Sequence, residues 1–285
     1  MPTALAICPH ADDAAAFFGG TLTKFADEGW KTVLVRVTDD AKDSVGSDLT
    51  DTTSRNRAEL AEAAKIMGVA EVVELGFATD CLGDASEVSL RERIVYLFRK
   101  YRPYAVFTFD PFGINEGNMD HVVTAQAVEE AFWVSCFDLH HPEHAKEGLK
   151  PFSVCERWYY GRDLPGANYF VDITDQFDRR VSALCAHDMM MRNLINQLRL
   201  QVQTWGRRMP AFDDAFEGDT RPLLEQWMRL KCESEAQEGN LLAGRLAESF
   251  RLVRFGGFEE LIQRGSEPIP GAEPPVPRPG LDIEP

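Results

Sequence analysis

The sequence predicts an α/β protein built on an open, mostly parallel β-sheet with helices on both faces. Two observations support this. Short apolar or β-branched runs alternate with segments of helical periodicity over residues 3–110, and such alternation implies parallel strands joined by right-handed crossovers. Polar residues also follow the strands at the carboxyl ends, where ligands bind in Rossmann-like sheets of this kind.

The first half of the chain supplies strands and helices in alternation. Strands are expected where apolar or β-branched residues form short runs, at residues 3–8, 31–38, 70–77 and 104–110. Helices are expected where apolar residues recur at helical spacing, at residues 14–29, 53–68 and 88–102. The first two helices end at glycine and the third ends before proline, which are ordinary stop signals.

The second half is expected to extend this core. A helix is predicted over residues 122–137. Further strands are predicted within 152–161 and 167–174, and long helices over 176–205 and about 221–250. These elements would form the helical C-terminal extension of the sheet.

We therefore expect one α/β domain over residues 1–265, with its Rossmann-like core at about 1–140. The C-terminal strands and long helices would occupy about 150–265. Residues 266–285 contain seven prolines and little periodicity, so this tail is expected to be extended or disordered.

The charge of the chain bounds its partners. The 285 residues carry a formal net charge of −16, which repels phosphate backbones and anionic headgroups, so neither nucleic acid nor a membrane is an expected partner. A neutral or cationic small molecule, or a metal cation, suits this charge better. The sequence leaves the oligomeric state open, with a homo-oligomer as one alternative.

The cysteines and the N-terminus indicate the compartment. Six cysteines are scattered without a C-x-x-C pair, which fits neither a disulfide framework nor a cysteine zinc site. The N-terminus lacks the basic and apolar segments of a signal peptide, and no apolar run reaches the roughly 18 residues of a membrane span. These features favour a cytoplasmic protein.

The first predicted strand runs into the sequence PHADD. His10 and Asp13 lie in a strand-to-helix turn and can face one point, and His121 opens the element after the fourth strand, at the same sheet edge. Two imidazoles and one carboxylate suit a catalytic zinc with one position left for water. Zinc would acidify that water, and Asp12, left free beside it, would be the general base.

Each of these residues also has a structural alternative. Asp12 or Asp13 could cap the following helix, and His10 could be a turn histidine with its hydrogen bonds satisfied. Asp120 could orient a metal ligand or cap the helix that begins there. The metal site is favoured because the residues gather at strand ends of one predicted sheet.

The motif PHADD followed by GGTL resembles the PHPDD…GGT signature of the LmbE-like, or PIG-L-type, zinc-dependent N-deacetylases. Weaker similarities follow in the family's order, in the segments RPYAVFTFDPFG with MDH, VDITDQFDRRVSALCAHD and LAESFRLVR. The resemblance covers most of residues 3–255. The first motif is specific, and the order of the later ones adds weight.

This resemblance implies that His10, Asp13 and His121 bind one zinc ion per chain, with another divalent transition metal as an alternative, and that Asp12 is the general base. It implies a hydrolase that removes an acetyl group from the nitrogen of an amino sugar or related small metabolite, with metal-bound water as the nucleophile. A minority of the family hydrates unsaturated keto acids at the same site, and this is the alternative activity. A non-catalytic binding module on the same scaffold is a third hypothesis.

Asn118 departs from the family pattern, because it stands where the first histidine of HPDH is expected. Asparagine can donate a hydrogen bond to an oxyanion but cannot carry a proton. Three alternatives follow: Asp12 shuttles the proton alone, another histidine supplies it, or the reaction is not amide hydrolysis.

His187, which matches the family's later histidine, is the candidate substitute acid; the alternative is a buried helix histidine bonded to a carboxylate. His140, His141 and His144 could form a second metal site, although their loop context favours a solvated cluster.

Asn56 is a second departure, since the family often has a substrate-contacting arginine there. Arg57 beside it, with Asp110 and Asn115 after the fourth strand, are candidate substrate contacts. The aromatic residues 158–160 could stack on a sugar face, but such residues belong more often to the core.

Overall fold

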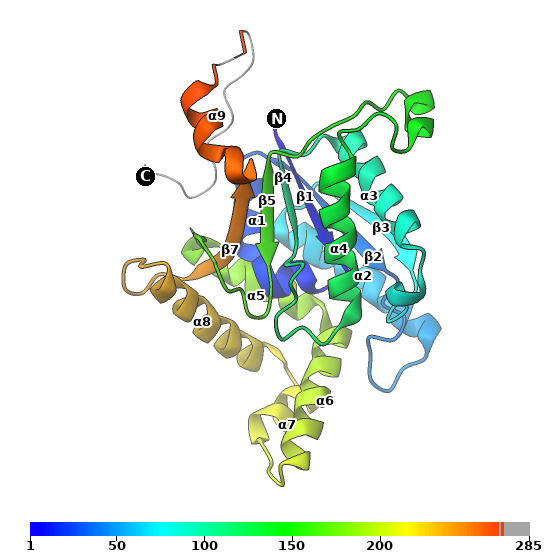
Figure 1. The fold of residues 1–285 in the computed structure, drawn as a ribbon. Coiled ribbons are helices and arrows are strands. Elements are labelled where there is room, and N and C mark those ends of the chain that lie inside the picture. Colours follow the sequence, from blue (N-terminus) through cyan, green and yellow to red (C-terminus); the bar gives the residue numbers. More distant parts are fainter. Residues whose placement is uncertain (268, 271–285) are drawn as a thin grey trace.

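A seven-stranded sheet forms the centre of the computed structural model, which describes residues 1–267, 269 and 270 (Figure 1). The strands are β1 (Thr3–Cys8), β2 (Lys31–Thr38), β3 (Glu71–Phe77), β4 (Ala105–Phe109), β5 (Glu156–Tyr160), β6 (Tyr169–Asp172) and β7 (Ala247–Arg254). Their order is β3-β2-β1-β4-β5-β7-β6. The first five pair in parallel, whereas β7 is antiparallel to β5 and β6. The predicted Rossmann-like, mostly parallel α/β fold is confirmed.

Helices cover both faces of this sheet. They are α1 (Gly19–Asp27), α2 (Leu49–Met67), α3 (Glu87–Tyr101), α4 (Met119–Val134), α5 (Phe177–Ala186), α6 (Asp188–Thr204), α7 (Pro210–Glu217), α8 (Arg221–Glu238) and α9 (Glu259–Gly265). Apolar residues of α1, α2, α5, α6 and α8 share one core, and those of α3 and most of those of α4 share the other. In Figure 1, α6 and α7 extend beyond the end of the sheet toward which β1 and β5 point.

β1 shows why the strands are so apolar. Ala4 and Ala6 belong to the core that contains α1, whereas Leu5 and Ile7 belong to the core that contains α3, and all four are fully buried. A central strand with both faces covered needs apolar residues at every position. The apolar run stops at Pro9, where the chain leaves the sheet for the site described below.

The C-terminal half differs from the prediction in two places. The helix expected over 176–205 is two helices, α5 and α6, separated by the non-helical backbone of His187 (φ −85°, ψ 56°). The helix expected over 221–250 ends at Glu238, and Ala247–Arg254 is strand β7. Residues of β7 pair with β5 on one side and β6 on the other, so sheet pairing overrides the local helical pattern.

The expectation for the tail, residues 266–285, falls largely outside the described residues. Within the described part of the chain, no helix combines the length and the apolar character needed to cross a membrane.

Candidate metal centre and active site

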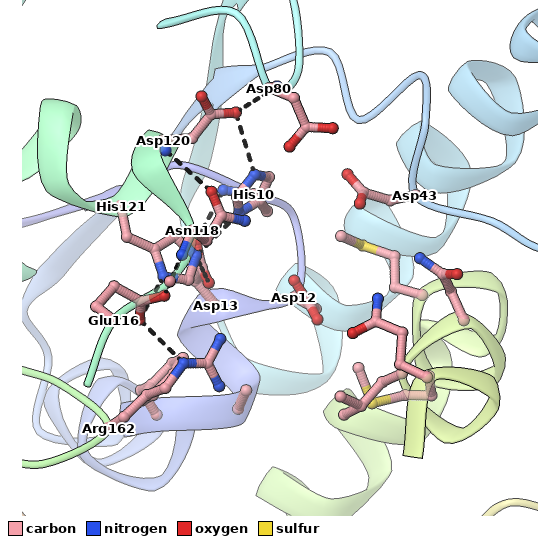
Figure 2. Close-up of a pocket in the computed structure, with 18 of the residues that line it drawn as sticks. His10, Asp12, Asp13, Asp43, Asp80, Glu116, Asn118, Asp120, His121 and Arg162 are labelled. Atoms are coloured by element: carbon pink, nitrogen blue, oxygen red, sulfur yellow. Dashed lines mark hydrogen bonds and ion pairs between the residues drawn. The ribbon is translucent and has the colours of Figure 1, made fainter. Parts of the chain in front are cut away.

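A cavity of about 620 Å³ opens where β1 and β4 end (Figure 2). One side is built by the turn after β1, with His10, Asp12 and Asp13, and by the start of α4, with His121. Strands β1 and β4 are neighbours in the sheet. Their carboxyl ends therefore bring together residues more than a hundred positions apart, as ligand sites in parallel sheets require.

His10, Asp13 and His121 converge at the bottom of this cavity. His10 Nδ1 lies 3.1 Å from His121 Nε2, which lies 3.3 Å from Asp13 Oδ1. One ligand atom from each residue lies within 4.8 Å of the other two, and all three side chains are buried. Ligand atoms about 2.0–2.2 Å from one tetrahedral ion would be roughly 3.3–3.6 Å apart. The donor set therefore fits a zinc-like divalent cation.

The local backbone fixes Asp13 in this arrangement. Asp13 has helical dihedrals (φ −54°, ψ −45°) at the start of a π-helical turn, Ala14–Phe18, but its side chain makes no capping hydrogen bond. Instead its Oδ2 accepts a hydrogen bond of 2.8 Å from the backbone N–H of His10. The carboxylate is thereby turned back toward the two histidines rather than toward the helix that follows.

Asp120 and Glu116 lie next to the second ring nitrogens of His10 and His121. Asp120 Oδ2 lies 3.5 Å from His10 Nε2 and accepts a 2.7 Å hydrogen bond from the N–H of Asp80. Glu116 Oε2 lies 2.9 Å from His121 Nδ1. Carboxylates on the second ring nitrogen fix a ligating histidine's orientation and tautomer. Asp120 therefore contacts His10, from the distant motif, rather than His121, its neighbour in sequence.

Glu116 was not anticipated from the sequence. It lies in the loop between β4 and α4, and its carboxylate also accepts from Arg162 Nε at 3.0 Å and from the N–H of Asn118 at 2.8 Å. Figure 2 shows the Arg162–Glu116 contact beside His121. An acidic residue shortly before a candidate histidine ligand was the available signal. The contact between Glu116 and His121 depends on how the loop between β4 and α4 folds back.

The electrostatics of the cluster also favour a cation. Burial lowers the pKa of His10, but the contact with Asp120 and the charge of Asp13 outweigh it and raise that pKa to about 10. Burial also lowers the pKa of His121, but the charge of Asp13 outweighs burial and raises that pKa to about 9. The carboxylates thus carry negative charge that neutral imidazoles cannot offset. A bound divalent cation would supply the missing positive charge and keep both imidazoles neutral.

Asp12 lies beside the cluster and remains unengaged. It lines the cavity, and no hydrogen bond joins its carboxylate to another of the residues that the structure describes. Burial, and next the charge of Asp13, raise the pKa of Asp12 to about 7. Figure 2 shows its carboxylate apart from the histidine cluster and facing the cavity. This is the geometry of a carboxylate that can accept a proton from a molecule in the cavity.

Asn118 is the N-cap of α4 and also lines the cavity. Its Oδ1 accepts a 2.9 Å hydrogen bond from the N–H of Asp120. Because the oxygen is committed to the helix, the side-chain NH₂ is the group that can donate to a bound molecule. The capping role considered for Asp120 therefore belongs to Asn118.

The other predicted substrate contacts do not line this cavity. Asp110 accepts a 2.7 Å hydrogen bond from Arg251, and Asn115 bonds to Asp163. Arg57 points to Glu74, with a 3.0 Å hydrogen bond, and its side chain is 62% exposed. Since the cavity lining includes none of these three, we assign them no part in the site below.

His187 is fully buried at the junction of α5 and α6, and it does not line the cavity. Neither ring nitrogen has a hydrogen-bond partner among the described residues, and burial lowers its pKa to about 4.

His144 is buried as well, with its Nε2 2.8 Å from Glu92 and its Nδ1 3.2 Å from Arg99. The prediction that His140, His141 and His144 form a solvated cluster is therefore wrong for His144, which is buried. The aromatic residues 158–160 are core residues, as the structural alternative predicted.

A second possible donor group shares His10 with Asp40 and Asp43. Asp40 is already engaged, because it accepts 2.9 Å hydrogen bonds from Arg36 and from Thr38. Asn56, at the position where an arginine was expected, is fully buried and donates to the carbonyl oxygen of Asp40 at 2.9 Å. It holds a loop in place rather than facing the cavity. The group with Asp13 and His121 is the better cation site.

Helices α6 and α8 form the opposite side of the cavity, which we call the helical wall. It consists of Met190, Met191, Asn193, Leu194 and Gln197 from α6 and Trp227 from α8. Trp227 is 42% exposed although it is large and apolar. The helical wall combines apolar surface with two amides, whereas the side with His10 is strongly acidic.

Comparisons with known proteins identify the family of this chain. Residues 5–132 match the PIG-L family model, described as GlcNAc-PI de-N-acetylase. A diacetylchitobiose deacetylase from Thermococcus kodakarensis is 31% identical over 186 residues, which is 65% of this chain and 68% of the relative.

Solved structures share the fold. The N,N′-diacetylchitobiose deacetylase from Pyrococcus horikoshii has a TM-score of 0.71 at 23% identity, covering 91% of this chain and 88% of its own. The 4-carboxy-2-hydroxymuconate hydratase from Pseudomonas putida has a TM-score of 0.63 at 16% identity, covering 89% and 96%. The matched segment 5–132 contains His10, Asp12, Asp13 and His121. The chain belongs to the PIG-L, or LmbE-like, family of deacetylases.

Proposed function

We propose that this protein is a divalent-metal-dependent hydrolase that removes an acetyl group from the nitrogen of an amino sugar. The observation that carries the proposal is the convergence of His10, Asp13 and His121 beside the unengaged carboxylate of Asp12. A zinc-like cation with three protein ligands and a nearby carboxylate is a suitable constellation for amide hydrolysis. The activity of the Thermococcus relative, acting on diacetylchitobiose as its name states, supports an N-acetylated sugar as the substrate.

The charge of the cavity favours this reaction over hydration of an unsaturated keto acid. Six carboxylates line it: Asp12, Asp13, Asp43, Asp80, Glu116 and Asp120. Among the described lining residues the one Arg or Lys is Arg162, and it is paired with Glu116 at 3.0 Å. A dicarboxylic or tricarboxylic substrate would meet repulsion here. A neutral N-acetyl sugar would not, and its product amine would be attracted as an ammonium ion.

The residues divide the chemical work between them. A divalent cation held by His10, Asp13 and His121 would polarise the acetamide carbonyl and acidify water. Asp12 would take the proton from the attacking water, which enters between it and the carbonyl carbon. The NH₂ of Asn118 would donate to the carbonyl oxygen as negative charge develops there. Asp12 would then deliver its proton to the departing amine, since Asn118 cannot carry one.

The proposal is tested by acetate release. Purified protein loaded with zinc would be incubated with N-acetylglucosamine, N,N′-diacetylchitobiose and an unsaturated keto acid, before and after chelation. Metal-dependent acetate release from an N-acetyl sugar supports the proposal. Hydration of the keto acid with no acetate from any N-acetyl sugar would replace it with the hydratase alternative.

The Asn118→Asp variant tests the proposed oxyanion contact. Aspartate caps a helix as well as asparagine does, so α4 should be preserved, but the donor is lost and a carboxylate stands where negative charge would develop. We expect kcat to fall roughly 10²–10³-fold, the usual effect of removing one oxyanion donor, with little change in KM. Steady-state kinetics check this, with circular dichroism as the folding control. A variant that keeps more than half of the wild-type kcat would exclude Asn118 from this role.

Trp227→Ala tests the helical wall as the surface that holds the sugar. Covering about 30–55 Å² of apolar tryptophan surface with a sugar ring contributes roughly 0.7–1.4 kcal/mol, so KM should rise about threefold to tenfold while kcat stays nearly constant. Leu230→Ala is the matched control, since Leu230 also lies on α8 and is exposed but does not line the cavity. Equal KM values in wild type and Trp227→Ala would show that the sugar does not bind against the helical wall.

A further inference from the structure

The turn that carries Asp12 and Asp13 is joined to α1 through a break in the helix. The π-helical turn Ala14–Phe18 starts directly after Asp13, and Phe18, which precedes α1, has non-helical dihedrals (φ −147°, ψ 24°). Single π-helical turns occur frequently at functional sites. The direction in which Asp12 and Asp13 project therefore depends on how this break is held.

Glu248, from β7, binds the first turn of α1 across the break. Its Oε1 accepts from the N–H of Gly20 at 2.9 Å, and its Oε2 accepts from the N–H of Thr21 at 2.6 Å. The first N–H groups of an α-helix have no intrahelical partner. A carboxylate placed there satisfies two of them and interacts favourably with the helix dipole.

Arg180, from α5, binds the π-helical turn on the other side of the break. Its Nε donates to the carbonyl oxygen of Ala15 at 3.2 Å, and its Nη2 donates to that of Ala16 at 2.6 Å. Ala16 lines the cavity, and its own N–H donates to the carbonyl oxygen of Asp12 at 2.9 Å. Arg180 is thus two hydrogen bonds away from the backbone of the proposed general base.

Arg180 and Glu248 also bind each other, with Nη1 3.0 Å from Oε1 and both side chains fully buried. A buried ion pair carries a large desolvation cost, so its value for stability alone is small. The chain makes room for it, because a Cβ at Gly20 would lie 2.7 Å from Ile173 and 3.0 Å from Glu248 Oε1. The glycine of the GGTL motif therefore allows the close approach of this pair.

We propose that Arg180 and Glu248 are positioning residues for the metal site. Together they clamp the two sides of the helix break and so fix the turn from which Asp12 and Asp13 project. This inference rests on the metal site of the proposed function. It assigns control of metal affinity to an ion pair on α5 and β7, outside the segment 5–132 that matches the family model.

Glu248→Gln and Arg180→Met test the inference in the full-length protein. Glutamine keeps the size of glutamate, but both Glu248 oxygens accept from N–H groups, so its NH₂ must face at least one donor. We expect the Kd for zinc, measured by chelator competition, to rise about tenfold in both variants, as for outer-shell partners of metal ligands. We also expect the visible absorption spectrum of the cobalt-loaded protein to change, because the ligand geometry shifts.

Arg99→Met is the matched control. Arg99 is also buried and donates to backbone carbonyls, among them those of Ser135 at 3.2 Å and Phe137 at 2.8 Å, but it lines no part of the cavity. It should lower Tm while leaving the zinc Kd and the cobalt spectrum unchanged.

The positioning role and the proposed function can fail separately, and different results show which of them has failed. Wild-type zinc Kd and an unaltered cobalt spectrum in Glu248→Gln, despite a lower Tm, would show that the pair is structural only. This variant decides the question if Arg180→Met does not fold. A wild-type protein that binds zinc but releases no acetate would refute the proposed function, whereas a raised zinc Kd in the variants would still support the positioning role.

Discussion

Asp12→Asn should lower kcat about 10³-fold, within the 10²–10⁴ range typical of a lost general base. Asparagine cannot accept a proton, whereas the carboxylate of Asp12 faces the cavity without a hydrogen-bond partner among the described residues. Because Asp12 is not one of the converging ligands, bound metal should stay at the wild-type level. Acetate-release kinetics and metal analysis of the same preparations check both expectations.

Asp80→Asn is the control for this result. Asp80 also contributes a carboxylate to the cavity lining, but it contributes no atom to either possible metal group. Its replacement removes one negative charge from the cavity without removing the proposed base, so kcat should change less than about threefold. Retention of more than a tenth of the wild-type kcat in Asp12→Asn would contradict the assignment of Asp12 as the general base.

His121→Ala should abolish both tight metal binding and acetate release. It removes one of three converging ligands and leaves Glu116 without the imidazole that lies 2.9 Å away. Free zinc at 100 times Kd should stabilise the wild-type protein by about 2.7 kcal/mol, which appears as a higher Tm. The variant should show no such increase, as calorimetry with and without zinc would reveal.

His144→Ala is the matched histidine control for that experiment. His144 is as well buried as His121, but its partners are Glu92 and Arg99, and it does not line the cavity. It should lower Tm while the increase on adding zinc persists. An equal zinc-dependent increase in His121→Ala would mean that the cation binds elsewhere.

The core of the site was predictable because it depends on one structural rule. Apolar runs mark β1 and β4, and the polar residues that follow parallel strands meet at one sheet edge. His10 and His121 could therefore be paired from the sequence although 111 residues separate them. Asp13 followed from its spacing to His10 within a single turn.

The residues behind the ligands were harder to predict, because they depend on loop conformation. Asp120 was expected to orient a ligand or cap a helix, and it faces His10, from the distant motif. Glu116 reaches His121 only because the loop after β4 folds back through positive-φ positions at Gly113 and Asn115. No local pattern specifies such a return.

The C-terminal half was the least predictable, because long-range pairing decides it. The segment AESFRLVR becomes β7 since β5 and β6 offer it edges on both sides. The break at His187 separates α5 from α6, and α6 then contributes to the helical wall of the cavity. The substrate-facing wall therefore comes from elements whose placement was not evident from periodicity.

The most direct test of the metal centre is an anomalous difference map from crystals of the zinc-loaded protein, measured at the zinc absorption edge. We predict one strong peak per chain, bounded by His10 Nδ1, His121 Nε2 and the carboxylate of Asp13. The absence of a peak there, or a peak between Asp40 and Asp43 instead, would contradict it.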